Sequence, residues 1–215
     1  MASRPTAPLP HRDDLLIESE RRVWDGRFPL DLVDFRQRRF DGAWSGVRRW
    51  ELWRRGRAAA LLPYDPVRDA VALIEQFRLP ALAAGVDPVL VELPAGLCEA
   101  GEPAEQTILR EAAEEAGLVP DRLTRIGEVL LTPGGSDELC AIFAGRVLLP
   151  EPGPDGLLGH AGLAAEDEDI RIRAWPAAAA IEAAFAGRFT NAVTLLAVLW
   201  LAAQRDRLRR DWSET

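Results

Sequence analysis

Residues 103 to 117 constrain the fold of this chain most, because they form one strongly helical segment among segments that resemble β-strands. Pro103 suits a first helical turn, and the sequence AEQTILREAAEEAG contains good helix formers with an apolar set available for a buried side. Gly117 supplies the stop. Two strand-like segments follow, RLTRIGEVLLT and ELCAIFAGRVLL, and others precede the helix. Strands before and between helices predict an α/β or α+β fold with a mixed β-sheet.

The segment from about Arg21 to Leu93 has the pattern of a β-meander. DLVDFRQRRF leads into Asp41 and Gly42, a pair typical of hairpin turns, and RRWELWRRG alternates bulky with charged residues. AAALLPY and AVALIEQF then flank the turn sequence DPVRD. Residues 1–14 are rich in proline and lack periodicity, so we expect a loose arm there.

The C-terminal third alternates a loop, a strand and two helices. A segment rich in glycine, proline and aspartate leads to EDEDIRIRAW, which we expect to be a strand at its end. Pro176 opens a helix that runs through about Phe185. The sequence TNAVTLLAVLWLAAQRDRL predicts a long final helix with Thr190 as its cap.

Composition excludes several classes of protein. A chain of 215 residues with 48% hydrophobic and 28% charged residues is typical of a soluble globular protein with a sizeable core. No apolar run reaches the roughly 18 to 20 residues of a membrane span, and the N-terminus lacks the apolar core of a signal peptide, so we expect no membrane partner and a cytoplasmic location. A net charge of −8 argues against nucleic acid as the main partner, although a local basic cluster or a cation could still hold an anionic substrate.

The helix carries three crowded carboxylates in the stretch REAAEEAG, residues 110–117. Glu111 and Glu115 are i,i+4 neighbours and Glu114 is i,i+3 from Glu111, so the three side chains converge. Each such pair costs a few tenths of a kcal/mol, and Arg110 offsets only part of this. A cation would remove the conflict, and all-oxygen ligands select Mg²⁺ or Mn²⁺. These eight residues alone fit a plain solvated helix face as well.

The residues around this stretch carry a resemblance to a known family. Five residues separate Gly96 from Glu102, seven separate Glu102 from Arg110, and the segment closes with EEAGL at position 118. This spacing over residues 96–118 resembles the Nudix box, the loop–helix–loop signature of Nudix hydrolases. The one departure is Ala112, where a larger aliphatic residue is usual, and it affects packing only. The resemblance implies the Nudix fold, in which helices sandwich a mixed β-sheet, here with an N-terminal antiparallel β lobe.

Nudix hydrolases cleave a nucleoside diphosphate linked to another moiety, and the resemblance implies that chemistry here. A diphosphate repels hydroxide, so the reaction needs cations on the phosphate oxygens. By resemblance, Glu111 and Glu115 are the principal metal ligands and catalytic residues. Glu114 would assist them, and the carbonyl of Ala95 is an expected further ligand.

The remaining residues of the box are expected to shape it. By the same resemblance, Glu102 and Arg110 form a structural pair that braces the helix. Gly96 and Gly117 are the structural glycines at the two ends of the box.

Sequence outside the box is similar to the ADP-ribose pyrophosphatase subgroup, from about Val23 to Trp200. The similarity rests on LLPYDPVRDAVALIEQFR, on VELPAG before the box, and on TPGGSDE, which contains Pro133. It includes GLAAEDEDIRI, which is similar to the acidic loop that carries the catalytic base of that subgroup. Glu166 is then the candidate base and Glu168 a possible further metal contact. Without the resemblance, this segment reads as an acidic surface loop.

The resemblance also suggests substrate-binding residues. Arg78 resembles the arginine near the phosphates or the terminal ribose, since an arginine fork matches phosphate geometry, with a rim salt bridge as the alternative. Arg49 and Phe28 lie where the N-terminal region of the subgroup meets the adenine, but Trp50 stands where an arginine is common. Glu138 could contact the terminal ribose or close a turn.

These expectations combine into one hypothesis with two rivals. Residues 1–56 would form the N-terminal arm and β lobe, which in the subgroup forms a homodimer, and residues 57–208 the Nudix hydrolase domain. The expected reaction is Mg²⁺-dependent hydrolysis of ADP-ribose to AMP and ribose 5-phosphate. One rival is the same chemistry on another nucleotide sugar, such as GDP-mannose or ADP-glucose. The other is a non-catalytic nucleotide-binding sensor, which the full set of carboxylates argues against.

Overall fold

The chain forms two compact units. The computed structural model describes residues 7–162 and 168–213. The N-terminal unit comprises Met1–Arg57 and Leu130–Leu139, and the sheet unit comprises Ala58–Val129 and Cys140–Thr215. Residues 130–139 thus group with the N-terminal strands. The expected division at residue 56 had placed them in the other unit. The functional meaning of that division stays a prediction.

A three-stranded antiparallel sheet makes up most of the N-terminal unit. Its strands are β1 (Leu15–Trp24), β2 (Leu30–Gln37) and β3 (Arg48–Trp53), in the order β1-β2-β3. The expected turn at Asp41 and Gly42 is present: the Gly42 N–H donates to the Arg39 carbonyl at 2.9 Å, and Gly42 has a φ of 82°. β1 begins earlier than the expected start near Arg21, because pairing with β2 holds it while nearly all its side chains are exposed. Such a strand has no buried face to produce a periodic pattern.

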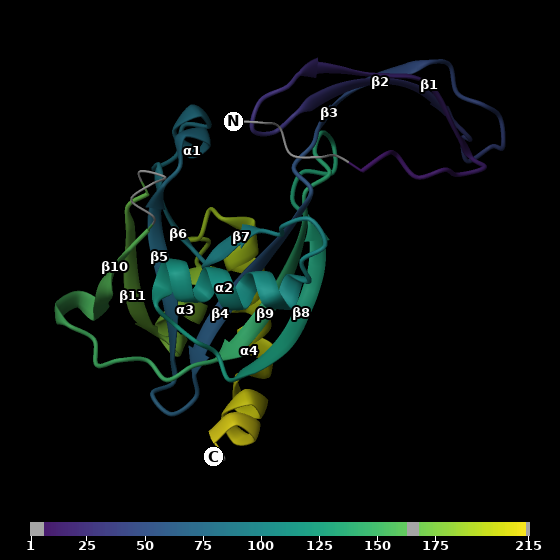
Figure 1. Cartoon of the computed structure of the whole chain (residues 1–215). Helices are drawn as coiled ribbons and strands as arrows, with labels where there is room; N and C mark the ends of the chain where they lie inside the picture. The colour runs from purple at the N-terminus through teal and green to yellow at the C-terminus, as the bar shows by residue number, and fades with distance from the viewer. Residues whose placement is uncertain (1–6, 163–167, 214–215) are drawn as a thin grey trace. The chain divides into compact units, whose positions relative to one another are not determined.

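An eight-stranded sheet forms the centre of the sheet unit (Figure 1). Its strand order is β10-β11-β5-β4-β9-β8, with β6 paired to β5 and β7 paired to β4. The strands are β4 (Arg57–Asp65), β5 (Ala70–Phe77), β6 (Val89–Glu92), β7 (Ala95–Leu97), β8 (Arg122–Leu130), β9 (Leu139–Arg146), β10 (Leu157–Ala161) and β11 (Ile170–Pro176). β4 and β5 pair with each other only beside their turn, at Tyr64–Val71 and Asp65–Ala70. β7, which carries the start of the box, pairs with β4 instead.

The helices begin and end near their sequence signals. They are α1 (Leu79–Ala83), α2 (Ala104–Ala116), α3 (Ala177–Phe185) and α4 (Ala192–Ser213), with a 3₁₀ turn η1 at Pro154–Gly156. α2 starts after Pro103 and ends at Gly117, whose left-handed φ of 62° accompanies an N–H bond to the Ala113 carbonyl at 3.1 Å. The expected cap of α4 at Thr190 is wrong. Asn191 caps this helix, because its Oδ1 accepts from the Thr194 N–H at 3.0 Å.

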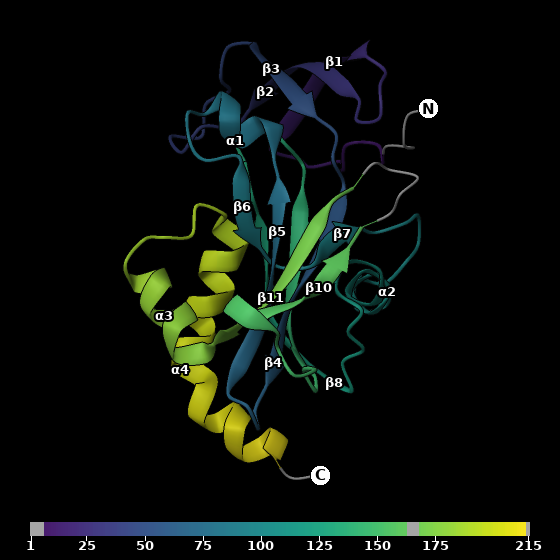
Figure 2. The same cartoon turned by 90° about the vertical axis from the view of Figure 1, so that its left-hand side faces the viewer.

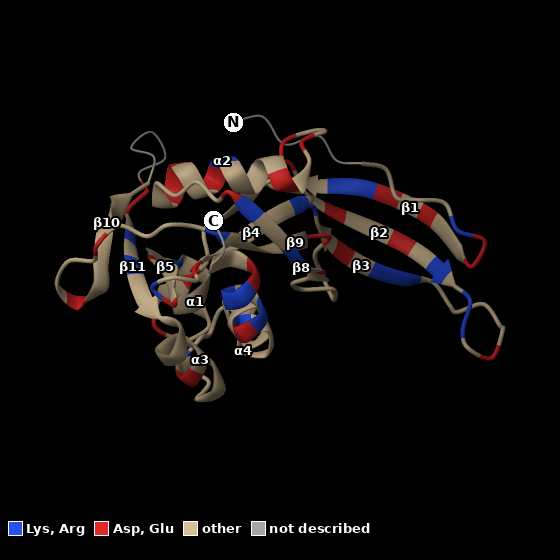
Figure 3. Ribbon diagram, turned by 90° about the horizontal axis from the view of Figure 1, so that it is seen from below, with Lys and Arg blue, Asp and Glu red and all other residues tan. Residues whose placement is uncertain are grey.

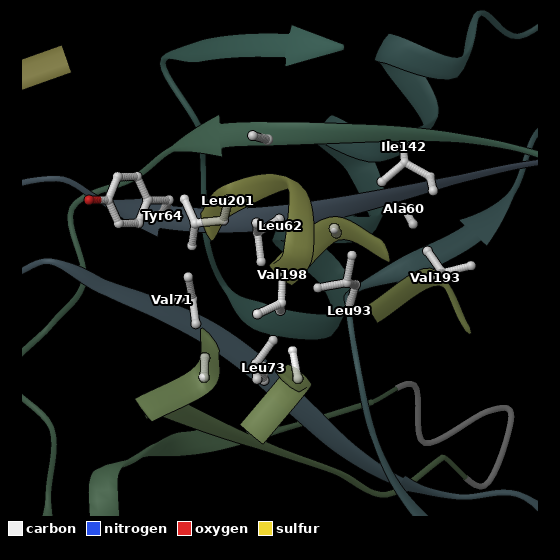
Figure 4. Close-up of a cluster of buried hydrophobic side chains, with 14 of the residues drawn as sticks. Ala60, Leu62, Tyr64, Val71, Leu73, Leu93, Ile142, Val193, Val198 and Leu201 are labelled. Atoms are coloured by element: carbon white, nitrogen blue, oxygen red, sulfur yellow. The ribbon is translucent and has the colours of Figure 1, made fainter. Parts of the chain in front are cut away.

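Helices cover both faces of the sheet, as expected (Figure 2). Along β4, Ala60, Leu62 and Tyr64 pack into the cluster formed with α3 and α4, which Figure 4 shows in close-up. Their neighbours Ala59 and Leu61 pack on the opposite face against α2. All five are fully buried, which explains why this strand reads as a continuous apolar run.

Several short elements, β7 and η1 among them, were not expected from the sequence. β10 lies inside the Gly- and Pro-rich segment that reads as a loop, and it pairs with β11 through an irregular register between Leu157 and Gly159. α1 occupies a five-residue segment directly after β5. Among the described residues, no helix is long and apolar enough to cross a membrane.

Candidate active site

The carboxylates of α2 meet the backbone of β7. The Ala95 N–H donates to Oε2 of Glu115 at 2.8 Å. A Cβ added to Gly96 would lie 1.9 Å from Oε1 of Glu111, so the Glu111 side chain fills the space that any other residue would need there. Two glutamates of the helix are thus packed directly against the loop that precedes it.

Burial makes the charged forms of these glutamates costly. The pKa of Glu115 is raised to about 8, mainly by burial and also by the negative charges of Glu111 and Glu168, while the Ala95 N–H bond acts in the opposite direction. The pKa of Glu111 is also raised, mainly by burial, although Arg110 opposes the shift. A divalent cation would stabilise the ionised form of both side chains. The all-oxygen donor set and this electrostatic conflict fit Mg²⁺ or Mn²⁺.

Arg110 ties the box together. Its Nε and Nη2 donate to Glu102 at 3.3 and 3.2 Å, which holds the pKa of Glu102 down at about 2. Its Nη1 also donates to Glu111 at 2.7 Å and to Glu114 at 3.2 Å. In this arrangement, no group of three or more acidic, His or Cys side chains in the described part of the chain is close enough to hold a metal. Arg110 is therefore the cation that these two carboxylates contact in this structure.

Glu168, which lies far from α2 in the sequence, is a further acidic residue near the same carboxylates. Gln76, on β5, donates from Nε2 to Oε1 of Glu168 at 2.7 Å, and Gln76 is buried. Glu168 is close enough for its charge to contribute to the raised pKa values of Glu111 and Glu115. Glu166, the candidate base, lies outside the described residues. Sequence reasoning missed Gln76, although two adjacent polar residues, Glu75 and Gln76, in an apolar strand were the available signal.

Arg78 is fixed by a buried carboxylate. Its Nε and Nη2 each lie 2.8 Å from Oε2 of Glu92, and Asn191 donates from Nδ2 to Oε1 of Glu92 at 2.8 Å. The positive charge of Arg78 also reaches Glu115, where it partly offsets the effect of burial on the pKa of that carboxyl. The sequence suggested Arg78 but gave no sign of Glu92 or Asn191.

The N-terminal unit brings two of its three candidates together. Arg55 donates to Glu138 at 2.7 Å from Nε, and its guanidinium carbon lies 4.0 Å from the ring centre of Phe28 and 4.8 Å from that of Trp53. Arg55 is therefore the residue that joins Phe28 to Glu138, and sequence reasoning missed it. The third candidate, Arg49, pairs instead with Asp34 on β2, through two hydrogen bonds of 2.7 Å.

The distribution of charge differs between the two units (Figure 3). Acidic bands mark α2, which carries the box, whereas arginine and acidic residues follow one another along β1, β2 and β3. A local acidic helix of this kind would attract a cation more effectively than the net charge of the chain.

Known proteins resemble this chain along most of its length. The family model described as NUDIX domain matches residues 54–193. ADP-ribose pyrophosphatase of Escherichia coli (strain K12) is 39% identical over 202 residues, which is 94% of each chain. ADP-ribose pyrophosphatase of Haemophilus influenzae is 34% identical over 207 residues, covering 95% of this chain and 93% of the relative.

Two further matches widen the comparison. GDP-mannose pyrophosphatase of Salmonella arizonae is 32% identical over 189 residues, covering 87% of this chain and 95% of the relative. A crystal structure described as an ADP compounds hydrolase has a TM-score of 0.64 and 22% identity, covering 91% of this chain and 98% of that one. The structural match supports the fold, and the sequence matches extend across the box and both flanking regions. The chain therefore belongs to the NUDIX domain family, as the spacing of its glycines and glutamates predicted.

Proposed function

We propose that this protein hydrolyses the diphosphate bond of ADP-ribose, with Mg²⁺, to give AMP and ribose 5-phosphate. The observation that carries the proposal is the pair of buried glutamates, Glu111 and Glu115, packed against the backbone at Ala95 and Gly96. The two relatives named ADP-ribose pyrophosphatase support the choice of substrate.

The chain offers a complete set of oxygen ligands for the metal. Glu111 and Glu115 would hold Mg²⁺, or Mn²⁺ in its place, with Glu114, Glu168 and the Ala95 carbonyl as further ligands. When bound, the ion supplies charge neutralisation at the diphosphate and lowers the pKa of a coordinated water. The protein contributes the packing of Glu111 and Glu115 on α2 against β7.

Glu166 is the proposed general base. It would accept the proton of the attacking water, and its neighbour in the loop, Glu168, is held by the buried amide of Gln76. A carboxylate on a loop can orient water only when the loop is correctly placed, so the bond from Gln76 to Glu168 would support this step.

Arginine and aromatic side chains would bind the substrate. Arg78 is the proposed ligand of a diphosphate oxygen or of the terminal ribose. Phe28, Arg49, Arg55 and Glu138 are proposed for the nucleoside or ribose ends, since Phe28 offers a ring for stacking and Glu138 an acceptor for hydroxyl groups. A homodimer and a cytoplasmic location complete the proposal.

A substrate panel tests this function directly. Purified protein with Mg²⁺ is given ADP-ribose, ADP-glucose and GDP-mannose, and the released monophosphate is measured. We expect ADP-ribose to have the highest kcat/KM. Preference for GDP-mannose would keep the chemistry and overturn the substrate, an outcome that the 32% identical relative makes worth testing.

Variants of the box test the catalytic hypothesis. Glu115→Gln should lower kcat by more than about 100-fold, beyond the roughly 10- to 100-fold loss typical of residues that only support a metal ligand. Glu102→Gln, which affects the brace to Arg110, should fall within that smaller range. Binding of ADP-ribose without turnover of any compound would instead support a nucleotide sensor.

A further inference from the structure

Three residues far apart in the sequence form one buried hydrogen-bonded chain. Arg78 follows β5, Glu92 ends β6, and Asn191 precedes α4, and the last two are 99 positions apart in the sequence. Glu92 is only 5% exposed, and among the described residues its carboxylate accepts hydrogen bonds from these two partners. A buried carboxylate is stable only when it is paired, so Glu92 depends on both neighbours.

The two carboxylate oxygens of Glu92 contact different partners. Oε2 accepts a hydrogen bond from Nε of Arg78 at 2.8 Å and lies in an ion-pair contact of 2.8 Å with its Nη2, and Oε1 accepts from Nδ2 of Asn191 at 2.8 Å. One edge of the guanidinium is therefore fixed against the protein. Its Nη1 has no hydrogen-bond partner among the described residues, and the Arg78 side chain is 42% exposed. The free edge can bind a second anion without breaking the bond to Glu92.

Asn191 joins this chain to a helix. Its Oδ1 accepts from the backbone N–H of Thr194 at 3.0 Å and from the Thr194 hydroxyl at 3.2 Å. The cap needs an acceptor and Glu92 needs a donor, so both ends of the amide are fixed in one orientation. Only an amide meets both demands: serine could cap the helix but not reach Glu92, and aspartate could cap it but would repel Glu92.

We propose that Glu92 and Asn191 are positioning residues that hold Arg78 ready to bind the diphosphate of the substrate. The proposal rests on the function proposed above. The N-terminus of α4 would then contribute to substrate binding without touching the substrate. The physical reason is pre-organisation: an arginine that is already ordered loses less rotamer freedom when the anion binds.

Asn191→Ser is the sharpest test, because it keeps a capping oxygen and removes the donor to Glu92. With ADP-ribose and Mg²⁺ we expect KM to rise about tenfold with kcat nearly unchanged. The thermal midpoint should fall modestly, because Oε1 of the buried Glu92 loses its donor, whereas Thr190→Ala, an adjacent exposed position that serves as the matched control, should change neither KM nor the midpoint. An unchanged KM in Asn191→Ser would overturn the proposal.

A double-mutant cycle separates positioning from general damage. In an Arg78→Ala background, Asn191→Ser should raise KM no further, since there is no guanidinium left to position. If Asn191→Ser has the same effect in both backgrounds, its action does not pass through Arg78 and the proposal is wrong.

A measurement without substrate distinguishes this proposal from the proposed function. The 26 basic residues of the chain are all arginine, and the Nε–H signal of Arg78 in an NMR spectrum is identified by its loss in Arg78→Lys. We expect this proton to exchange slowly with solvent in the parent and at least about tenfold faster in Asn191→Ser. Equal exchange rates would overturn the positioning role. A parent that hydrolyses no nucleotide sugar would instead overturn the function.

Discussion

Glu115 couples ionisation to folding in the metal-free protein. Burial raises the pKa of Glu115 to about 8, above the ordinary value of 4.5. A raised carboxyl pKa means that the folded state binds the proton more tightly than the unfolded chain. Its contribution to stability is therefore fully present below about pH 4.5 and is lost as the pH rises through about 8.

Glu115→Gln should remove this loss of stability. In EDTA, we expect the variant to be more stable than the parent at pH 9 by about 2 kcal/mol, with little difference at pH 5. Urea unfolding at the two pH values measures it. Glu105→Gln, an exposed position on the same helix, is the control and should show no such difference. A parent whose stability is independent of pH over this range would contradict the account.

Gly96 leaves no room for a side chain. An added Cβ would lie within 2.0 Å of two atoms of the Glu111 carboxylate, so Gly96→Ala must displace Glu111. We expect about a 100-fold loss of kcat and weaker Mn²⁺ binding, followed by electron paramagnetic resonance, with the fold retained. Gly127→Ala, whose Cβ would meet open space, should change neither. Unchanged Mn²⁺ affinity in Gly96→Ala would contradict the placement of Glu111.

Residues inside the box could be predicted from the sequence, whereas several of their supports could not. Glu111 and Glu115 are four positions apart on a helix, so their convergence follows from helix geometry alone. Gln76 and Asn191 act across strands and helices that the sequence does not align with one another. Their partners become apparent only once the sheet order is known.

At the scale of elements, local sequence signals predicted both ends of α2. Pro103 and Gly117 set its ends, and both were readable because helix termini have their own residue preferences. β1 and β10 were missed or misplaced, because an exposed or edge strand has no buried face to impose a period of two. The cap of α4 moved by one residue to Asn191, within the usual uncertainty of helix boundaries.

The turn between β4 and β5 is joined to α4 by an ion pair. Asp69 accepts at 2.8 Å from Nε of Arg205 and at 2.8 Å from the Tyr64 hydroxyl. The Arg205 hydrogen bond is the main reason that the pKa of Asp69 is lowered from 3.8. A lowered pKa gives stability that is present above about pH 4 and is lost as the pH falls through the folded-state pKa.

Asp69→Asn tests this link. Asparagine tolerates the left-handed φ of 54° at this position, so the change removes the charge without adding strain. We expect a loss of about 1 to 3 kcal/mol at pH 7, measured by urea unfolding, and a smaller loss near pH 3. Asp155→Asn makes the same change at a φ of 58° on an exposed residue and should be neutral. Equal effects at the two positions would contradict the account.

At the scale of the whole molecule, the aromatic residues of the N-terminal unit bear on assembly. Trp24, Trp50 and Trp53 are 66%, 43% and 44% exposed. Large exposed aromatic side chains are enriched where protein surfaces meet. We therefore expect a particle of two 23.7 kDa chains by light scattering. Trp24→Asp should shift it toward one chain, and a monomeric parent would contradict the predicted homodimer.

Arg110 gives the site one more property. Its guanidinium already bonds to Glu111 and Glu114 before a metal is present. The protein thus keeps a tethered cation beside the carboxylates. We expect a Mg²⁺ ion to compete with this built-in charge, so that the metal affinity of the site would reflect a difference between two cations.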